Sequence, residues 1–220
     1  MQPVRLQSVY QQVSHLLAAW GLVIFAWIFF IATRNRCVDR LFCGMDKAYV
    51  YHKYLSIAAL ALVWIHKLTI DLGKIRVVRT VQTEAPRLFG IKISSIGEGA
   101  AEYSLLLFSG LAVLAIVAVK LDYQKWKLLH KLMLVPFFLG VIHYYISSRY
   151  LVFALNPFSL WMNFVILIGV LSAVYSVFLY ERTAFRYRYR VVQLREVAAG
   201  ALEITATAID KELRYKPGQF

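Results

Sequence analysis

The sequence predicts an all-α membrane protein of five transmembrane helices, followed by a short β segment at the C-terminus. Of the 220 residues, 60% are hydrophobic, and the mean hydropathy is +0.59. This is more apolar surface than a soluble domain of this size buries, so a lipid bilayer is the predicted environment. A late change from continuous apolar runs to alternating ones indicates the β strands.

Five apolar runs have the length of a bilayer-spanning helix, about 20 residues. They cover Leu16 to Thr33, Ala48 to Thr69, Tyr103 to Val119, Leu128 to Ile146 and Leu160 to Tyr180. The first, third and fifth runs contain no charged residue. The second and fourth carry internal histidines, which are costly in hydrocarbon unless they are paired or bound. These two helices are therefore predicted to hold the functional site.

Positive charges gather in three connections, which we predict to face the cytoplasm. They are Arg34, Arg36, Arg40 and Lys47 after the first span, Lys120, Lys125 and Lys127 after the third, and Arg182, Arg186, Arg188 and Arg190 after the last. The connection from Ile70 to Gly99 is placed outside, as a folded cap on the membrane surface, although it is also basic. The expected location is the plasma membrane, with a cytoplasmic C-terminus.

The formal net charge of +13 does not indicate a nucleic-acid partner. Lys and Arg lie between apolar runs rather than along one basic face, so the bilayer is the predicted partner. Cys37 and Cys43 are too few for a disulfide framework and lack the spacing of metal ligands. They are predicted to be unpaired thiols.

Alternation after the last span predicts a β-hairpin. Tyr187, Tyr189 and Val191 alternate with polar residues, Leu202 and Ile204 do so again, and Gly200 lies between the two runs. A few strands do not form a stable core. We therefore expect residues 1–182 to form the membrane domain and residues 183–220 to begin a longer, incomplete domain.

The histidines of the second and fourth spans have closely similar spacings. His52 and His66 lie 14 residues apart, and His130 and His143 lie 13 apart. At the rise of an α-helix each separation is about 20 Å, as expected for two haems stacked one in each leaflet. Fourteen residues are nearly four turns, whereas 13 leave His143 more than a third of a turn from His130. Pro136 lies between them and is predicted to kink or rewind that helix.

A six-coordinate haem takes one imidazole from each side. Both helices are predicted to run from inside to outside, so His52 pairs with His130 at an inner haem and His66 with His143 at an outer haem. A single intramembrane histidine often serves only to hydrogen-bond a neighbouring helix. Four histidines, two per helix at matching depth, favour two b-type haems. His15 has no partner at comparable depth and is predicted to be interfacial.

Other residues lie near the expected haem levels. Trp64, Phe137 and Phe138 fall between the two irons, and packing is their predicted role. Lys67 and Arg149 are candidate cations beside the outer haem. Three arginines of the inner face are candidates either for haem propionates or for the cytoplasmic positive belt: Arg34, Arg36 and Arg40.

Three motifs together resemble the ferric reductase-like transmembrane domain shared by NADPH oxidases and ferric reductases, such as the haem domain of a bacterial NADPH oxidase. They are His52-Lys-Tyr-Leu-Ser with Trp64-Ile-His66, Leu129-His130-Lys-Leu with Ile142-His143-Tyr, and Tyr215-Lys-Pro217-Gly-Gln-Phe220. The last is similar to the strand that opens a flavin-binding barrel of the ferredoxin-reductase type. The resemblance runs from about Leu16 to Phe220. Such oxidases are usually described with six spans, which leaves a sixth helix open.

The resemblance implies an NAD(P)H oxidase or ferric reductase type of enzyme. Electrons would pass from NAD(P)H to FAD in a cytosolic domain, in cis or in trans, and then through two haem b groups to an external acceptor. The acceptor would be dioxygen, giving superoxide or peroxide, or a ferric iron chelate. His52 and His130 would hold the inner haem, and His66 and His143 the outer one. The sequence ends before any flavin or nicotinamide motif, so no residue is assigned to those cofactors and none to catalysis.

Other functions remain open at this stage. Four histidines on two helices also occur in quinone- or ascorbate-linked cytochromes b, and in the haem subunit of a repair reductase fed by a separate flavin protein. A different class is a transporter or channel whose intramembrane histidines bind a transition metal or relay protons. Pairs about 20 Å apart are too distant to share one metal ion. A structural scaffold would leave four costly histidines unexplained.

Overall fold

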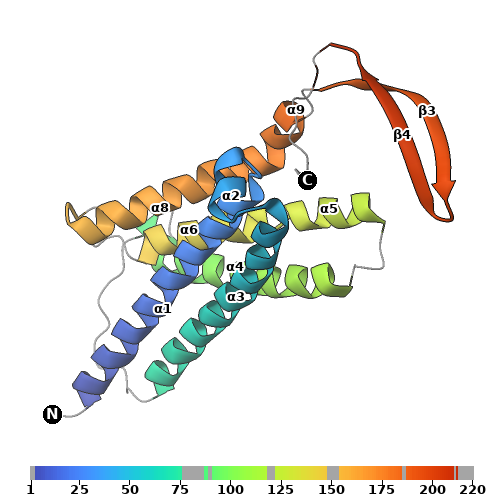
Figure 1. Ribbon diagram of the computed structural model, residues 1–220. Helices are drawn as coiled ribbons and strands as arrows, with labels where there is room; N and C mark the ends of the chain where they lie inside the picture. Colours follow the sequence, from blue (N-terminus) through green and yellow to red (C-terminus); the bar gives the residue numbers. More distant parts are fainter. Residues whose placement is uncertain are drawn as a thin grey trace. The chain divides into compact units, whose positions relative to one another are not determined.

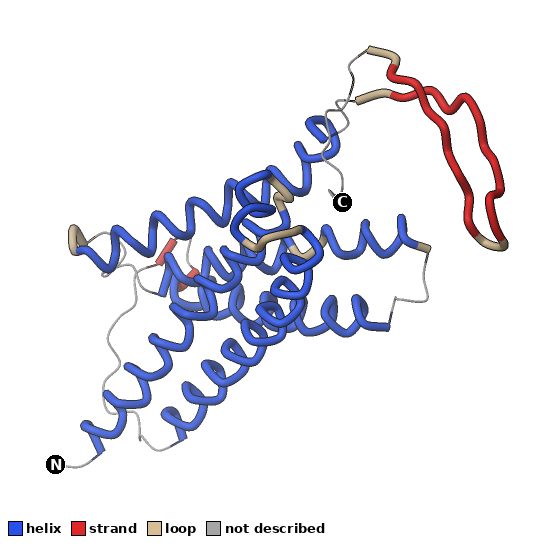
Figure 2. The backbone as a smooth tube through the Cα atoms, viewed as in Figure 1, coloured by secondary structure: helices blue, strands red, loops and turns tan. Residues whose placement is uncertain are grey.

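The protein is mostly helical, with a small two-stranded sheet near the C-terminus (Figure 1). The computed structural model describes residues 3–75, 87–88, 91–117, 122–147, 154–184, 187–210 and 212. The chain divides into two compact units, Met1–Val177 and Phe178–Phe220, which are described separately below. Helices make up nearly all of the described part of the first unit (Figure 2).

The helices follow the apolar runs of the sequence. They are α1 (Pro3–Ala32), α2 (Arg36–Leu41), α3 (Met45–Ile75), α4 (Ile93–Val117), α5 (Tyr123–Lys131), α6 (Leu134–Ser147), α8 (Pro157–Val174), a π-helix (Tyr175–Leu179) and α9 (Tyr180–Ala184). Five segments are long and apolar enough to cross a membrane: Val9–Ala32, Met45–Gly73, Ile93–Val117, Tyr123–Ser147 and Pro157–Thr183. Each coincides with one predicted span, so the five-helix membrane fold is confirmed.

The connection predicted between the second and third spans is shorter than expected. Residues 70–75 complete α3, and residues 93–99 already belong to α4. Ser95 and Glu98 lower the local hydropathy without preventing the helix, which is why a count of apolar residues placed its start too late. Between these helices Arg87–Leu88 (β1) pairs antiparallel with Ile91–Lys92 (β2). The rest of the predicted external cap lies outside the described residues.

The fourth span is interrupted where its proline predicts. A turn at Leu132 and Met133 separates α5 from α6, four and three residues before Pro136. Because proline has no N–H, it cannot bond the carbonyl of Leu132. The N–H of Val135 donates to that carbonyl instead, over 3.0 Å. The interruption lies between His130 and His143 and changes the angle at which the two residues leave the span.

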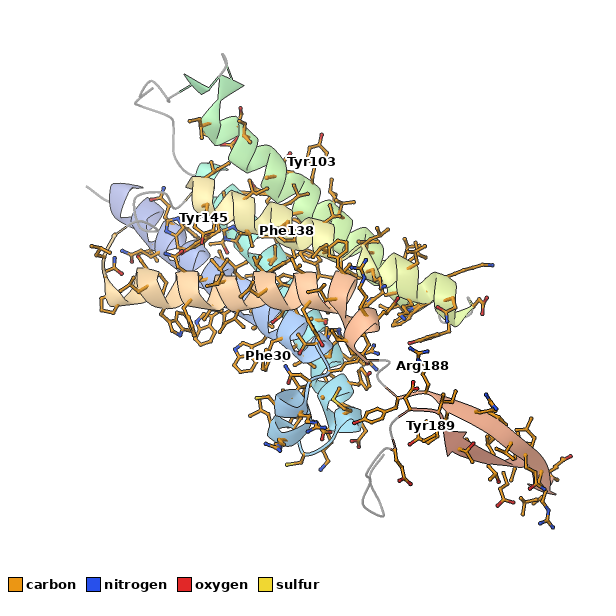
Figure 3. The ribbon with its side chains drawn as sticks, turned by 90° about the horizontal axis from the view of Figure 1, so that it is seen from above. Phe30, Tyr103, Phe138, Tyr145, Arg188 and Tyr189 are labelled. Atoms are coloured by element: carbon orange, nitrogen blue, oxygen red, sulfur yellow. The ribbon has the colours of Figure 1, made fainter. Side chains whose placement is uncertain are left out.

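Side chains from five helices, α1, α3, α4, α6 and α8, form the core of the membrane unit. Helix α1 packs against α3 and α8, and α4 packs against α6. The rings of Phe25 and Phe108 stack with centroids 4.2 Å apart, and the buried Phe137 contacts Phe29. The α6 residue Tyr145 donates its hydroxyl to Asn163 Oδ1 of α8 over 3.0 Å (Figure 3). Helix α1 thus lies at the centre of the packing.

The second unit contains the predicted hairpin, formed by β3 (Tyr189–Ala198) and β4 (Ala201–Ala208), which pair antiparallel. Gly200 has a φ of +82° in the connecting turn, a conformation that glycine adopts at no steric cost. The pairing register shifts twice, once between Val191 and Gln193 and once between Glu196 and Ala198. Every residue of both strands is exposed. The predicted barrel motif, residues 215–220, lies outside the described residues.

Candidate functional site

The structure brings the four sequence-predicted histidines together as two pairs. His52 of α3 meets His130 of α5, with ring centroids 6.0 Å apart and ring planes at 55°. His66 of α3 meets His143 of α6, with centroids 6.4 Å apart and planes at 60°. All four side chains are partly buried. The site therefore has two centres, separated along α3 by 14 residues.

The spacing within each pair fits one metal ion between the two rings. A metal bound at about 2 Å to one nitrogen of each imidazole separates the ring centres by about 6 Å. In the described part of the chain, the backbone of α3 makes little contact with α5 or α6. The two rings of each pair therefore approach one another from helices whose backbones stand apart.

The number of protein ligands also fits haem iron. Over the described residues, no group of three or more His, Cys, Asp or Glu side chains is placed to hold a metal ion. Each pair thus offers two imidazoles, whereas a structural or catalytic zinc site takes three or four protein ligands. Two axial imidazoles are what an iron requires when a porphyrin fills its other positions.

Hydrogen bonds orient both rings of the His66–His143 pair. Nδ1 of His66 lies 2.8 Å from the carbonyl oxygen and 2.8 Å from the Oγ of Ser14. Nδ1 of His143 lies 2.9 Å from the carbonyl oxygen of Gly97 and 3.1 Å from Ser147 Oγ. A carbonyl oxygen only accepts, so in each ring Nδ1 carries the proton and donates it. Nε2 then has its lone pair free to bind a metal.

The rings of the His52–His130 pair are held differently. The His52 ring is hydrogen-bonded to the backbone of Ile28 in α1. Nδ1 of His130 is buried and has no hydrogen-bond partner among the residues that the structure describes. The indole of Trp126 stacks on the His130 ring, with centroids 4.9 Å apart and planes at 10°. One ring of this pair is therefore oriented by a hydrogen bond and the other by stacking.

The three aromatic residues predicted between the two levels have packing contacts. Phe137 is almost fully buried and contacts Phe29 at 4.6 Å. Phe138 is half-buried beside it, edge to face at 6.1 Å (Figure 3). Trp64 donates its indole N–H to Ser109 Oγ of α4 over 3.1 Å. Packing, the role predicted for these residues, accounts for their positions.

Of the three predicted arginines, Arg34 contacts α3, the helix that carries His52. It follows α1 with a left-handed φ of +52°, and its guanidinium lies over the Tyr49 ring at 5.5 Å. The other two predicted arginines are exposed on the short helix α2: Arg36 and Arg40.

Two other candidate polar residues, Lys67 and His15, lie close to His66. Lys67 forms an ion pair with Asp71 one turn later, with Nζ 3.1 Å from Oδ2. His15 is exposed, as expected for an interfacial residue. Arg149 lies outside the described residues.

Several residues that hold the histidines were not predicted from the sequence. Ser147 and Trp126 each lie four residues from a histidine within one helical span, a spacing that places side chains on one face. That spacing is the signal that would have found them. Ser14, Ile28 and Gly97 act from other helices, and no spacing within the sequence shows such contacts.

Five helical spans with paired histidines at two levels define a multi-pass membrane protein with a two-centre site. The chain matches the family described as the ferric reductase-like transmembrane component over residues 17–141, more than half of its length. It belongs to this family of oxidoreductase-type membrane components, whose domains generally bind haem, and the predicted resemblance is confirmed. The match includes His52, His66 and His130 and ends two residues before His143. A comparison with curated proteins finds no match.

Proposed function

We propose that this protein transfers electrons across a membrane through two b-type haems, one held by His52 and His130 and the other by His66 and His143. The observation that carries the proposal is the meeting of two histidine pairs, with centroids 6.0 and 6.4 Å apart, on the same two spans. Each haem, when bound, supplies a one-electron Fe(III)/Fe(II) couple. The family supports the same reaction class.

The chain's own residues provide position and a defined ring orientation. Helix α3 carries one ligand of each pair, so it sets the separation of the two centres. Acceptors at Ser14, Ile28 and Gly97 hold three of the rings. A bond at Nδ1 raises the basicity of the opposite nitrogen, which strengthens its bond to iron. The positive charge of Arg34 favours a haem propionate on the inner side.

The electron donor in this proposal is NAD(P)H, acting through FAD on the cytoplasmic side of the plasma membrane. Residues 183–220 begin the flavin-binding barrel, and the flavin domain acts in cis or in trans. The acceptor is dioxygen or a ferric chelate at the external side, where Lys67 adds positive charge. The basic residues after the first and last spans support a cytoplasmic C-terminus.

Haem content tests the ligand assignment. The purified protein is expected to bind two haems per chain, measured as the pyridine haemochrome. His66→Leu and His143→Leu should each retain one haem that reduced flavin still reduces, because the inner pair is intact. His52→Leu and His130→Leu should each remove the other haem. The exposed His15 gives the matched control, and His15→Leu should retain both.

The proposal fails if the wild-type protein binds no haem, or if His66→Leu and His143→Leu retain both haems. The acceptor is tested separately with the complete protein and NAD(P)H, by following cytochrome c reduction with and without superoxide dismutase. Inhibition by the dismutase identifies dioxygen as the acceptor. Reduction of a ferric chelate that the dismutase does not affect identifies iron.

A further inference from the structure

His130 differs from the other three candidate ligands in how its ring is held. His52, His66 and His143 each have a hydrogen bond to a backbone group. The buried Nδ1 of His130 has none within the described part of the chain. A hydrogen bond at the far nitrogen normally fixes the orientation of a metal-binding imidazole. A different contact is needed to hold this ring.

Trp126 supplies that contact. It lies one helical turn before His130 in α5, so the two side chains share a face. The indole is nearly parallel to the imidazole, with planes at 10° and centroids 4.9 Å apart, which is the range of stacked aromatic pairs. The indole ring covers one face of the imidazole and opposes its rotation about χ2.

The indole is itself fixed by two further contacts. Its Nε1–H donates to the carbonyl oxygen of Ala115 in α4 over 3.3 Å. The Tyr123 ring stacks on it with centroids 6.2 Å apart and planes at 22°. Trp126 therefore connects the His130 ring to the backbone of a neighbouring helix, as the hydrogen bonds do for the other three histidines.

We propose that Trp126 is a positioning residue for the inner haem and that its stacked indole sets the rotation of the His130 ring. This inference rests on the proposed function, because the rotation matters only when His130 binds iron. In a low-spin ferric haem, the angle between the planes of two imidazole ligands is one of the factors that set the EPR g values. That angle is 55° in the inner pair, so a change in it is observable without turnover.

Three variants of the haem-loaded full chain test the role of the stacked ring. Trp126→Leu removes the aromatic face, and Trp126→Phe keeps an aromatic ring but loses the N–H bond to Ala115. Trp161, an exposed residue of α8, provides the matched control Trp161→Leu. The readouts are the low-spin EPR g values, the midpoint potential of each haem and the haem content. The outer haem serves as an internal reference in every sample.

Trp126→Leu is expected to shift the g values and the potential of one haem, or to lose that haem, while the other keeps its wild-type values. Trp161→Leu is expected to retain the wild-type values, and Trp126→Phe, which keeps an aromatic ring but not the bond to Ala115, is expected to shift them less than Trp126→Leu does. The inference is overturned if Trp126→Leu leaves both haems unchanged. It is also overturned if Trp126→Phe shifts or loses the inner haem as much as Trp126→Leu, since an aromatic ring at this position would then make no difference to His130. A wild-type chain without haem would instead refute the proposed function.

Discussion

Adding one methyl group at Gly169 should destabilise the membrane unit. A Cβ at this position of α8 would lie 2.7 Å from Ala26 Cβ and 2.9 Å from Ala26 Cα in α1. Carbon atoms pack best at about 3.5–4.0 Å, so the two helices must move apart by about 1 Å in Gly169→Ala. Overpacking of this kind costs about 1–3 kcal/mol, and the better helix propensity of alanine returns at most about 1 kcal/mol. With the full return from alanine, the net loss is up to about 2 kcal/mol.

The loss is measured as the free energy of unfolding in a denaturing detergent titration, followed by far-UV circular dichroism. Gly110 of α4 provides the matched control, because a Cβ there meets no atom within 4 Å. Gly110→Ala should be as stable as the wild type or more stable. If Gly169→Ala proved as stable as Gly110→Ala, the close approach of α1 and α8 would be wrong.

Two further predictions concern polar contacts. The ion pair between Lys67 and Asp71 joins half-exposed side chains and contributes at most about 0.5 kcal/mol. Lys67→Gln should therefore unfold at the wild-type detergent concentration but reduce an external acceptor more slowly. An unchanged rate would show that this charge has no part in the reaction. Asn35 caps α2 by accepting from the Val38 N–H over 2.9 Å, and it donates to Thr33 Oγ1. Asn35→Ala should therefore lose about 1 kcal/mol of unfolding free energy. Asn35→Asp, which keeps an acceptor for the Val38 N–H, should recover part of that loss. Equal stabilities for the alanine and aspartate variants would contradict the capping role.

The membrane fold was predictable because lipid leaves the chain few choices. A backbone in hydrocarbon must satisfy its own hydrogen bonds, so long apolar runs become helices. The same logic does not determine where a helix begins. Residues 93–99 are helical although Ser95 and Glu98 reduce their hydropathy, because polar side chains are tolerated at the ends of a span. The predicted connection was therefore too long.

The positions of the histidines were predictable because a helix has a fixed rise and angle per residue. His52 and His66 share a face for that reason, and Pro136 indicated that the fourth span departs from a straight helix. The contacts that orient the rings were not predictable. Ser14 and Gly97 bind histidines through backbone carbonyls, and every residue has a carbonyl, so side-chain type shows nothing of the contact.

Helix α1 explains how both rings of α3 obtain their hydrogen bonds. Ser14 serves His66 and Ile28 serves His52, so the two acceptors on α1 are 14 residues apart, as are the two histidines on α3. The later acceptor meets the earlier histidine, which is the register of two antiparallel helices in continuous contact. A straight helix packed along another straight helix therefore orients both of its rings through one interface.

The fourth span has no such interface, because a turn at Leu132 and Met133 divides it into two helices, α5 and α6. His143 on α6 takes its acceptor from Gly97 at the start of α4. His130 on α5 lies 13 residues earlier, and Ala115 near the other end of α4 bonds Trp126 rather than the histidine itself. The break that brings both imidazoles to α3 thus prevents one neighbouring helix from orienting both of them directly. The contact at the His130 ring is instead the stacked indole of Trp126, which is bonded to α4 in its turn.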